Sequence, residues 1–385
     1  MKIKTHCVVV AIASGCFGLL SHTQAANVST WTGASSSDWN TVGNWNPTAI
    51  PSNGWNGDRA FFDSTATSGT VNLNLSITAM GITFDSAGWT IENATAVLNF
   101  TQNTTPTGIT NNISSGTNTI NLQRIRNNSA GDNIPIITIA GGTLVLGGEV
   151  YRYGNSAWNF SGGGKVVQTG TDTSQGLPDL DAFTGEYYFA NGLSGTAWGA
   201  KNLGGTNALL GGVGQISMYG GHSGVTISGT IAPGGDGDVI ADPIGTIEIS
   251  GLTSINASGV SMNTGSAFQM DIGTMLGSND KIEFSNLYNR AFNYSNGTLD
   301  LKGTTIQDGT YILFEDIDAT VADFSGTFSS VLFNGSAINP SNFTMNYGTD
   351  LISVTISGLA IPEPSSAMFL GLSAAALVLR RKQKA

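Results

Sequence analysis

Apolar and polar residues alternate one by one over short stretches of this chain. The clearest run is residues 71–77, VNLNLSI, in which the aliphatic residues share one face and small polar residues share the other. Such alternation is typical of a β-strand with one buried face. We therefore predict one strand over this run, with Val71, Leu73, Leu75 and Ile77 all in the core.

Short runs of the same kind recur along most of the chain. Clusters of Gly, Asn, Ser and Thr separate them, and no helical period of comparable length interrupts them. The last run places Ile352, Val354 and Ile356 on one face. The pattern predicts an all-β protein of many short strands. The further runs are residues 81–84, 96–100, 119–122, 134–139, 143–146, 165–167, 266–272, 279–284, 298–301, 308–314 and 351–357.

Two arginines break the alternation within residues 120–126. A regular strand would place Arg124 and Arg126 on the same face as the apolar Ile120 and Leu122. Because arginine is almost never fully buried without a partner, we expect a corner or a bulge that turns both side chains to water.

The N-terminus has the pattern of a secretory signal. Two lysines precede an apolar segment at residues 8–20, and Thr23-Gln24-Ala25 is a small-x-small cleavage site. We predict a signal peptide over residues 1–25 that forms a helix and is cleaved between Ala25 and Ala26. A lipoprotein signal ending at Cys16 is the alternative. Both cysteines lie inside the signal, so we expect no disulfide and no thiolate chemistry in the mature chain.

The C-terminus combines a helix-breaking motif, an apolar segment and a basic end. Pro362, Glu363 and Pro364 precede an uncharged segment, and Arg380, Arg381 and Lys382 follow it. The 15 residues from 365 to 379 span roughly 22 Å as a helix, short of a hydrocarbon core of about 30 Å. We predict a short transmembrane helix with a basic membrane stop. A terminal amphipathic or core helix is the alternative.

This tail, residues 358–385, resembles the PEP-CTERM sorting signal of exported bacterial proteins. The resemblance implies an exosortase-type processing enzyme as partner and cleavage near Pro362 to Pro364. It also implies transient anchoring in the inner membrane before release to the envelope, cell surface or extracellular matrix.

Composition narrows the shape of the region between the two ends. Glycine accounts for 52 of 385 residues, charged residues for 11% and hydrophobic residues for 40%. So large an apolar share lets the chain fold, which a disordered polar chain cannot do. The remaining region is near the upper size limit of one compact core, and a stack of strand coils escapes that limit. We therefore expect an elongated β-solenoid.

The charge of that region argues against nucleic acid as a partner. The signal holds two lysines and the tail four basic residues and Glu363, so 9 basic and 25 acidic residues remain, a net charge of −16. Such a surface repels nucleic acid and anionic lipid.

Tryptophans are concentrated at the start of the expected solenoid, at Trp31, Trp39, Trp45 and Trp55. The first coil of a solenoid has no preceding neighbour, so bulky side chains are needed to close its core. We predict that residues 26–70 form an N-terminal cap. A carbohydrate-binding platform is the alternative, since exposed tryptophans stack on sugar rings.

Three stretches carry a second resemblance. Residues 31–62 follow the order W…W…NW…P…D-x-A-x-F, residues 159–193 contain SGGGKVVQTG and AFTGEYYFANG, and residues 224–251 contain PGG followed by IGTIEISG. The series resembles the passenger regions of autotransporter proteins and their passenger-associated repeat. It implies a right-handed parallel β-helix over residues 71–357. The chain departs from that family where the sorting tail replaces a translocator barrel.

Candidate catalytic residues form no distinctive pattern. His222, in a glycine turn, is far more often a surface residue than a catalyst. Pairs of aspartates can serve as acid and base in glycoside cleavage only at a separation of about 5–10 Å, and turns exposed to water explain them equally. Arg124, Arg126 and Arg152 are candidate bases for a polysaccharide lyase. The aspartate pairs are Asp179 with Asp181, Asp271 with Asp280, and Asp316 with Asp318.

A calcium loop is a further hypothesis. Asp236, Asp238 and Asp242 can supply hard oxygen ligands, but Val239 occupies the position at which a calcium nonapeptide has aspartate, and the motif does not repeat. We expect no cofactor.

The sequence thus predicts an exported structural or adhesive protein without enzymatic activity, associated with exopolysaccharide. The alternative is a polysaccharide-active β-helix enzyme, either a lyase or a glycosidase.

Overall fold

The computed structural model describes residues 28–358, except 53–56, 67–68, 101–107, 128–135, 153–157, 172–176, 196–200, 219–224, 241–243, 252–258, 288–289, 305 and 319–320. The predicted signal helix and transmembrane helix lie outside these residues. Within them, no helix is both long enough and apolar enough to cross a membrane.

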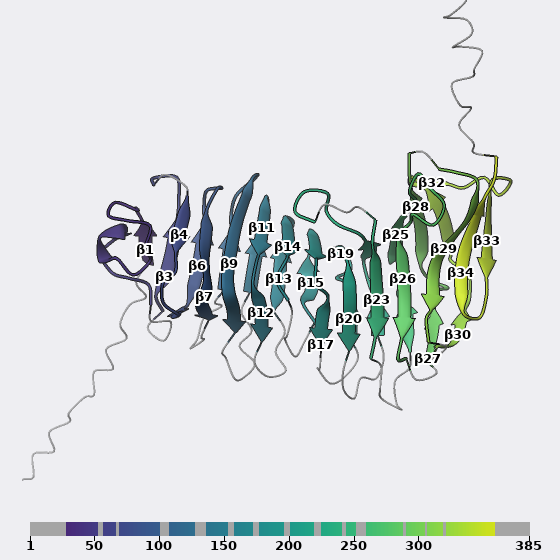
Figure 1. The fold of residues 1–385 in the computed structure, drawn as a ribbon, viewed down its shortest axis with the longest axis horizontal. Coiled ribbons are helices and arrows are strands. Elements are labelled where there is room, and N and C mark those ends of the chain that lie inside the picture. The colour runs from purple at the N-terminus through teal and green to yellow at the C-terminus, as the bar shows by residue number, and fades with distance from the viewer. Residues whose placement is uncertain are drawn as a thin grey trace, which may run out of the picture.

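The described chain is built from β-strands stacked along one long axis, with the N-terminal strands at one end and the C-terminal strands at the other (Figure 1). A 3-10 turn, η1 (Val42–Asn44), interrupts them near the N-terminal end. Within the described residues, the named strand pairs are parallel except β1–β2 near the N-terminal end and three pairs near the C-terminal end.

The strands form four sheets, and the first two run side by side through the N-terminal half. The first sheet has 8 strands and contains β1 (Val28–Trp31), β2 (Trp45–Asn46), β3 (Arg59–Phe62), β6 (Gly81–Phe84), β8 (Gly108–Asn111), β10 (Ile136–Ile139), β13 (Asn159–Gly162) and β15 (Asp179–Phe183). The second has 14 strands and contains β4 (Thr70–Asn72), β5 (Ile77–Ala79), β7 (Thr90–Phe100), β9 (Thr117–Asn127), β11 (Thr143–Leu146), β12 (Glu149–Arg152), β14 (Lys165–Gln168), β16 (Glu186–Phe189), β19 (Leu209–Gly212), β22 (Thr230–Pro233), β25 (Ala267–Asp271), β28 (Thr298–Lys302), β31 (Ser330–Phe333) and β32 (Ser336–Ala337).

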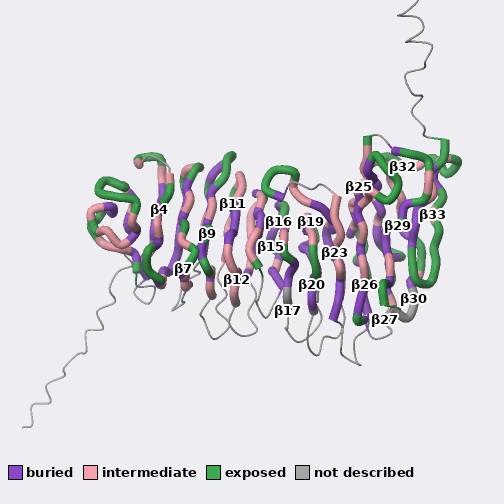
Figure 2. Tube along the Cα trace, in the orientation of Figure 1, coloured by how far each residue is buried: buried purple, intermediate pink, exposed green. Residues whose placement is uncertain are grey.

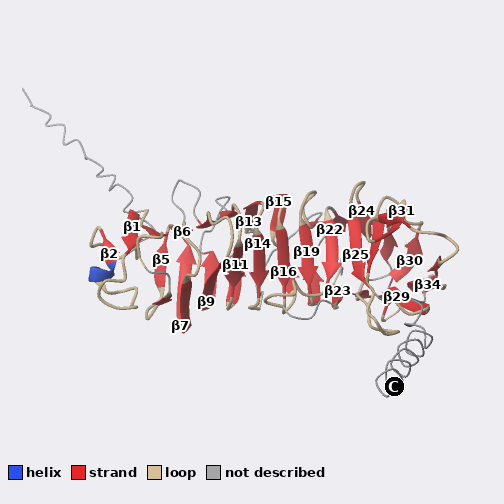
Figure 3. Cartoon of the chain, turned by 90° about the horizontal axis from the view of Figure 1, so that it is seen from above, coloured by secondary structure: helices blue, strands red, loops and turns tan. Residues whose placement is uncertain are grey.

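Two further sheets begin where the first sheet ends. The third has 7 strands and contains β17 (Leu193–Gly195), β20 (Gly214–Met218), β23 (Thr246–Ser250), β26 (Lys281–Ser285), β29 (Gly309–Asp316), β33 (Phe343–Tyr347) and β34 (Leu351–Ile356). The fourth has 5 strands and contains β18 (Lys201–Leu203), β21 (Val225–Ile227), β24 (Val260–Met262), β27 (Arg290–Asn293) and β30 (Val321–Ser325). The second sheet therefore extends through both halves (Figure 3).

Buried and more exposed residues alternate along many of the strands (Figure 2). Strands of one sheet pair in register, as Leu144 of β11 does with Val166 of β14. Both side chains are fully buried. Stacked aliphatic and aromatic residues therefore form a continuous core along the long axis.

The N-terminal end of the core is filled by tryptophan. Trp31, Trp39 and Trp45 are buried, and the ring centroid of Trp45 lies 5.0 Å from that of Trp31 and 4.8 Å from that of Trp39. The indole N–H of Trp39 donates to the carbonyl of Pro51, 3.2 Å away, and that of Trp45 to the carbonyl of Trp39, 2.7 Å away. These three rings pack in the interior and present no face to a sugar.

The prediction of a single strand over residues 71–77 is wrong, although Val71, Leu73 and Ile77 are buried as predicted. Two short strands, β4 and β5, replace it, and Leu75 between them is 65% exposed. The two strands pair with separate parts of the long strand β7. The intervening turn carries Leu75 out of the core.

The predicted bulge beside the arginines is confirmed. The pairing of β7 with β9 shifts register, and Leu122 and Ile125, three residues apart, are both buried. The alternation of buried and outward residues therefore shifts by one position between Leu122 and Ile125, which places Arg124 and Arg126 on the outer face.

The C-terminal end closes with antiparallel strands, which the sequence did not predict. β34 pairs antiparallel with both β29 and β33. Ile352, Val354 and Ile356 of β34 are buried on one face, as their alternation predicts.

Candidate functional site

An open groove of about 600 Å³ crosses the turns that lead into the second sheet from the first sheet and, farther along, from the fourth. It lies at the N-terminal ends of β11, β14, β16, β19 and β22, which are neighbours in the second sheet. We call it the central groove. Its lining residues are Ser114, Gly141, Gly142, Thr143, Gly163, Gly164, Lys165, Thr184, Gly185, Glu186, Asn207, Ala208, Leu209 and Thr230.

Small residues stacked on consecutive turns make the floor of the central groove. The amide N–H of Lys165 donates to the carbonyl of Gly142, and that of Glu186 donates to the carbonyl of Gly164. A Cβ on Gly185 would lie 1.9 Å from the carbonyl oxygen of Gly164, and one on Gly164 would lie 2.3 Å from a methyl of Ile139. The turns therefore pack too closely for a side chain, which leaves a concave surface.

Polar side chains follow the floor at successive strand positions. Thr143, Lys165 and Glu186 are paired in register, and Leu209 links this row to Thr230. Adjacent strands are spaced at about 4.8 Å, so the row repeats at that interval. Within the described part of the chain, the side chains of Thr143, Asn207 and Thr230 form no hydrogen bond or ion pair, so their donors and acceptors are free to bind a ligand.

Lys165 is surrounded by three carboxylates. Its Nζ lies 3.3 Å from Asp236, 3.4 Å from Asp238 and 4.0 Å from Glu186. Partial burial acts to lower the pKa of Lys165, but these negative charges, Asp236 foremost, outweigh it and raise the pKa above its ordinary value. The lysine charge is thus locally more than neutralised.

Asp236 belongs to a loop that lies over the second sheet. We call residues 234–240, the described start of the connection between β22 and β23, the clasp loop. The side chain of Asp236 is fully buried. Burial acts to raise its pKa, but the backbone N–H groups of Ile240 and Val239, together with Lys165, stabilise the carboxylate and lower the pKa.

The clasp loop also covers an apolar patch on the outer face of the sheet. Ile240 packs against Val145 of β11 and Val167 of β14, with Tyr188 and Ala190 beside them. Burial, followed by the charges of Glu186 and Asp236, raises the pKa of Tyr188 to about 12. The phenol therefore stays neutral under the loop.

The calcium hypothesis is not supported where it can be checked. The described residues contain no group of three or more His, Cys, Asp or Glu side chains that could hold a metal ion. Lys165 forms ion pairs with Asp236 and Asp238, where a calcium ion was expected. Asp242 lies outside the described residues.

In each predicted aspartate pair, at least one carboxylate is occupied by contacts within the fold. Asp280 accepts the backbone N–H groups of Asp271 and Gly245, both at 2.8 Å. Asp179 accepts the N–H of Asp181, and Asp318 accepts that of Asn286. These contacts stabilise turns.

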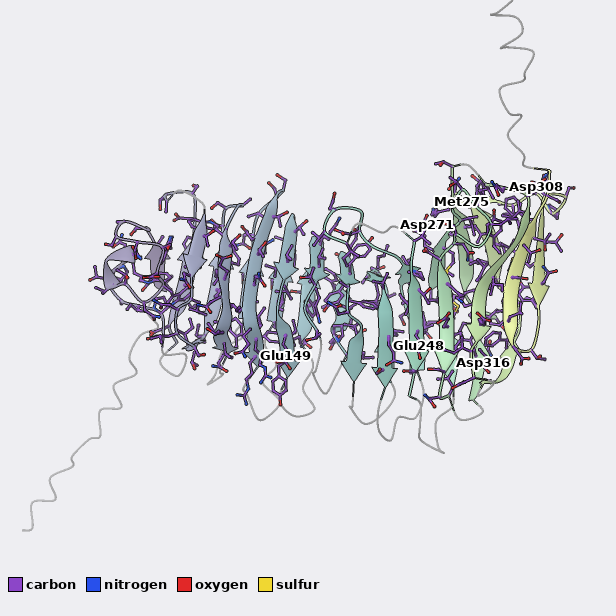
Figure 4. All side chains as sticks on the ribbon, in the orientation of Figure 1. Glu149, Glu248, Asp271, Met275, Asp308 and Asp316 are labelled. Atoms are coloured by element: carbon purple, nitrogen blue, oxygen red, sulfur yellow. The ribbon has the colours of Figure 1, made fainter. Side chains whose placement is uncertain are left out.

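The predicted bases lie apart from the central groove. Arg124 forms an ion pair with Glu149, and the guanidinium carbons of Arg124 and Arg126 lie 4.8 and 5.5 Å from the ring centroid of Tyr151. Figure 4 shows Glu149 at the edge of the molecule opposite Asp271. The side chain of Arg152, and His222 entirely, lie outside what the structure describes.

The chain matches the family model of the PEP-CTERM protein-sorting motif over residues 360–382. This range includes Pro362 to Pro364 and Arg380 to Lys382. The motif implies an exported, envelope-associated protein that an exosortase-type enzyme processes. No curated protein and no solved structure matches the chain significantly. No family match supports the resemblance to autotransporter passengers, which stays a prediction.

The sequence pattern predicted neither the central groove nor the clasp loop. Lys165 and Asp236 are 71 positions apart, and only the stacking of strands in the second sheet brings them together. A signal was nevertheless present: Val167 and Val145 are apolar at positions where alternation calls for a polar residue.

Proposed function

We propose that this protein is a structural and adhesive component of the cell surface or extracellular matrix that binds exopolysaccharide in its central groove. The observation that carries the proposal is the row of free hydroxyl and amide groups above a floor of small residues. We further propose that the stacked sheets form a right-handed parallel β-helix, with residues 26–70 as its N-terminal cap.

The groove suits a polymer of hydroxylated units. Thr143 of β11 and Thr230 of β22 offer donors and acceptors at positions set by the strand spacing, and Asn207 adds an amide in the turn before β19. A chain laid across the strands meets them in succession. Because the groove is open rather than enclosed, a long polymer can pass through it without a free end.

We propose a binding role without catalysis. Lys165 pairs with Asp236, Asp238 and Glu186, so the charged groups beside the groove stabilise one another and the clasp loop. A carboxylate held in an ion pair is a weak proton donor at neutral pH, because the positive charge favours its ionised form.

Retention on immobilised polysaccharide tests this proposal. Dextran and alginate, which carry no amino group, serve as the panel, and we expect the exported protein to be retained on at least one of them. Replacing Asn207 and Thr230 together by Ala should abolish that retention. Thr119→Ala, on the outer face of the same sheet but outside the groove, is the matched control and should leave retention unchanged.

Two results would contradict the proposal. Unchanged retention of the double variant would place binding outside the groove. Release of reducing ends or unsaturated sugars during incubation would favour the enzyme alternative.

A further inference from the structure

A second pocket, of about 460 Å³, lies at the C-terminal ends of β25, β28 and β31, which are later strands of the second sheet. We call it the Asp271 pocket. Its wall includes Asp271 at the end of β25, Lys302 at the end of β28, and the connection that follows β25. Figure 4 places Asp271 beside Met275 at one edge of the molecule, opposite Glu248 and Asp316.

Asp271 is a half-buried carboxylate whose side chain accepts no hydrogen bond from the described residues. Its nearest cationic neighbour, Lys302, is engaged elsewhere, since its Nζ lies 2.6 Å from Asp300. Burial raises the pKa of Asp271, and the charge of Lys302 offsets this only in part. Removing a carboxylate from water without a full ion-pair partner costs free energy. A cationic ligand beside Asp271 would recover part of that free energy.

The rest of the pocket offers hydroxyl groups and an apolar wall. The side chains of Thr274, Ser278 and Thr304 line it and form no hydrogen bonds within the described part of the chain. Ile244 and Ile272 supply the apolar part of the lining. Carboxylate, hydroxyls and an apolar surface together match a ligand with an ammonium group, hydroxyls and a face of C–H groups.

We propose that the Asp271 pocket binds a protonated amino sugar unit of a polysaccharide, with Asp271 accepting hydrogen bonds from the ammonium group. Thr274, Ser278 and Thr304 form hydrogen bonds with the sugar hydroxyls, and Ile244 and Ile272 contact its C–H face. This site deepens the proposed function by naming a class of polymer, but it rests on a different pocket. Each proposal can therefore fail alone.

Calorimetric titration of the mature exported protein with a glucosamine tetrasaccharide tests the amine requirement. The N-acetylglucosamine tetrasaccharide is the matched ligand, because acetylation removes the positive charge and keeps the hydroxyls. We expect the free-amine oligomer to bind about tenfold more tightly or better, the range expected for a hydrogen bond to a charged group. Equal binding of the two oligomers would overturn the proposal.

Variants assign the effect to this pocket. Asp271→Asn should weaken glucosamine binding about tenfold, for the same reason. Asp350→Asn removes one exposed carboxylate away from the pocket, beside Asp316 at the opposite edge, and should leave binding unchanged. Thr304→Arg, at an exposed position on the pocket wall, should weaken binding by repelling the amine. Wild-type affinity in both pocket variants would overturn the assignment, whereas loss of binding in Asn207→Ala alone would place the sugar in the central groove.

Discussion

The clasp loop covers one part of the outer face of the second sheet and leaves the rest uncovered. At the same strand position, the type of residue differs between the two parts. Under the clasp loop this position holds Val145, Val167 and Tyr188. On the N-terminal side of the loop, this position holds Thr119 of β9. On the C-terminal side, the outward residues are polar as well, with Gln269 of β25 paired with Asp300 of β28. The residue type at an outward position therefore reports whether a loop lies over it, since a strand buried on both faces is apolar throughout.

The largest effect should come from placing a polar group in the covered part. Val167 is fully buried, so Val167→Asn leaves an amide without partners and removes packing against Ile240. We expect a loss of about 3 kcal/mol in unfolding free energy. Thr119→Asn, at the equivalent uncovered position, should change it by about 0.5 kcal/mol or less. Denaturant unfolding compares the two, and equal losses would remove the distinction between covered and uncovered parts.

A smaller effect should follow from shortening the loop side chain that covers the patch. Ile240→Ala removes most of the contact with Val145 and Val167 and should cost about 2 kcal/mol in the free energy of loop opening. The adjacent Val239 is 41% exposed, so Val239→Ala should have almost no effect. Hydrogen exchange of the amides that donate to Asp236 measures the opening. Unchanged exchange in Ile240→Ala would show that the ion pairs alone hold the loop.

The smallest effect should be a dependence of loop opening on pH. The pKa of Asp236 is lowered in the folded protein, so its contribution is complete above the ordinary aspartate value of 3.8 and is lost as pH falls through the lowered pKa. Hydrogen exchange of the loop amides should therefore quicken only in strong acid. Lys165→Met removes one cause of the lowering and should shift this opening to higher pH. An identical pH profile in the variant would show that Lys165 does not stabilise Asp236.

The alternation of single strands could be predicted from the sequence, but their partners could not. Ile352, Val354 and Ile356 lie in the core as predicted. Leu75 follows the same local rule and is exposed, because β4 and β5 pair with separate parts of β7. Periodicity reports one strand at a time, whereas pairing decides where that strand ends.

The central groove and the clasp loop were harder to predict than the strands, because both depend on contacts between segments that are distant in the sequence. The central groove combines turns from Ser114 to Thr230, and its floor exists because Gly164 and Gly185 stack on consecutive turns. The acidic sequence neighbours of Asp236 favour a calcium loop, yet its partner is Lys165 on β14, three strands before β22 in the second sheet. Local spacing could not predict that lysine.

The most direct test is how the mature protein is released from intact cells. Cells are treated either with an enzyme that digests their exopolysaccharide or with detergent, and the protein in the soluble fraction is measured. Our account predicts release by polysaccharide digestion, with little further release by detergent. Protein that stays with the cells after digestion and leaves only with detergent would contradict it, because the membrane rather than the polysaccharide would then hold it.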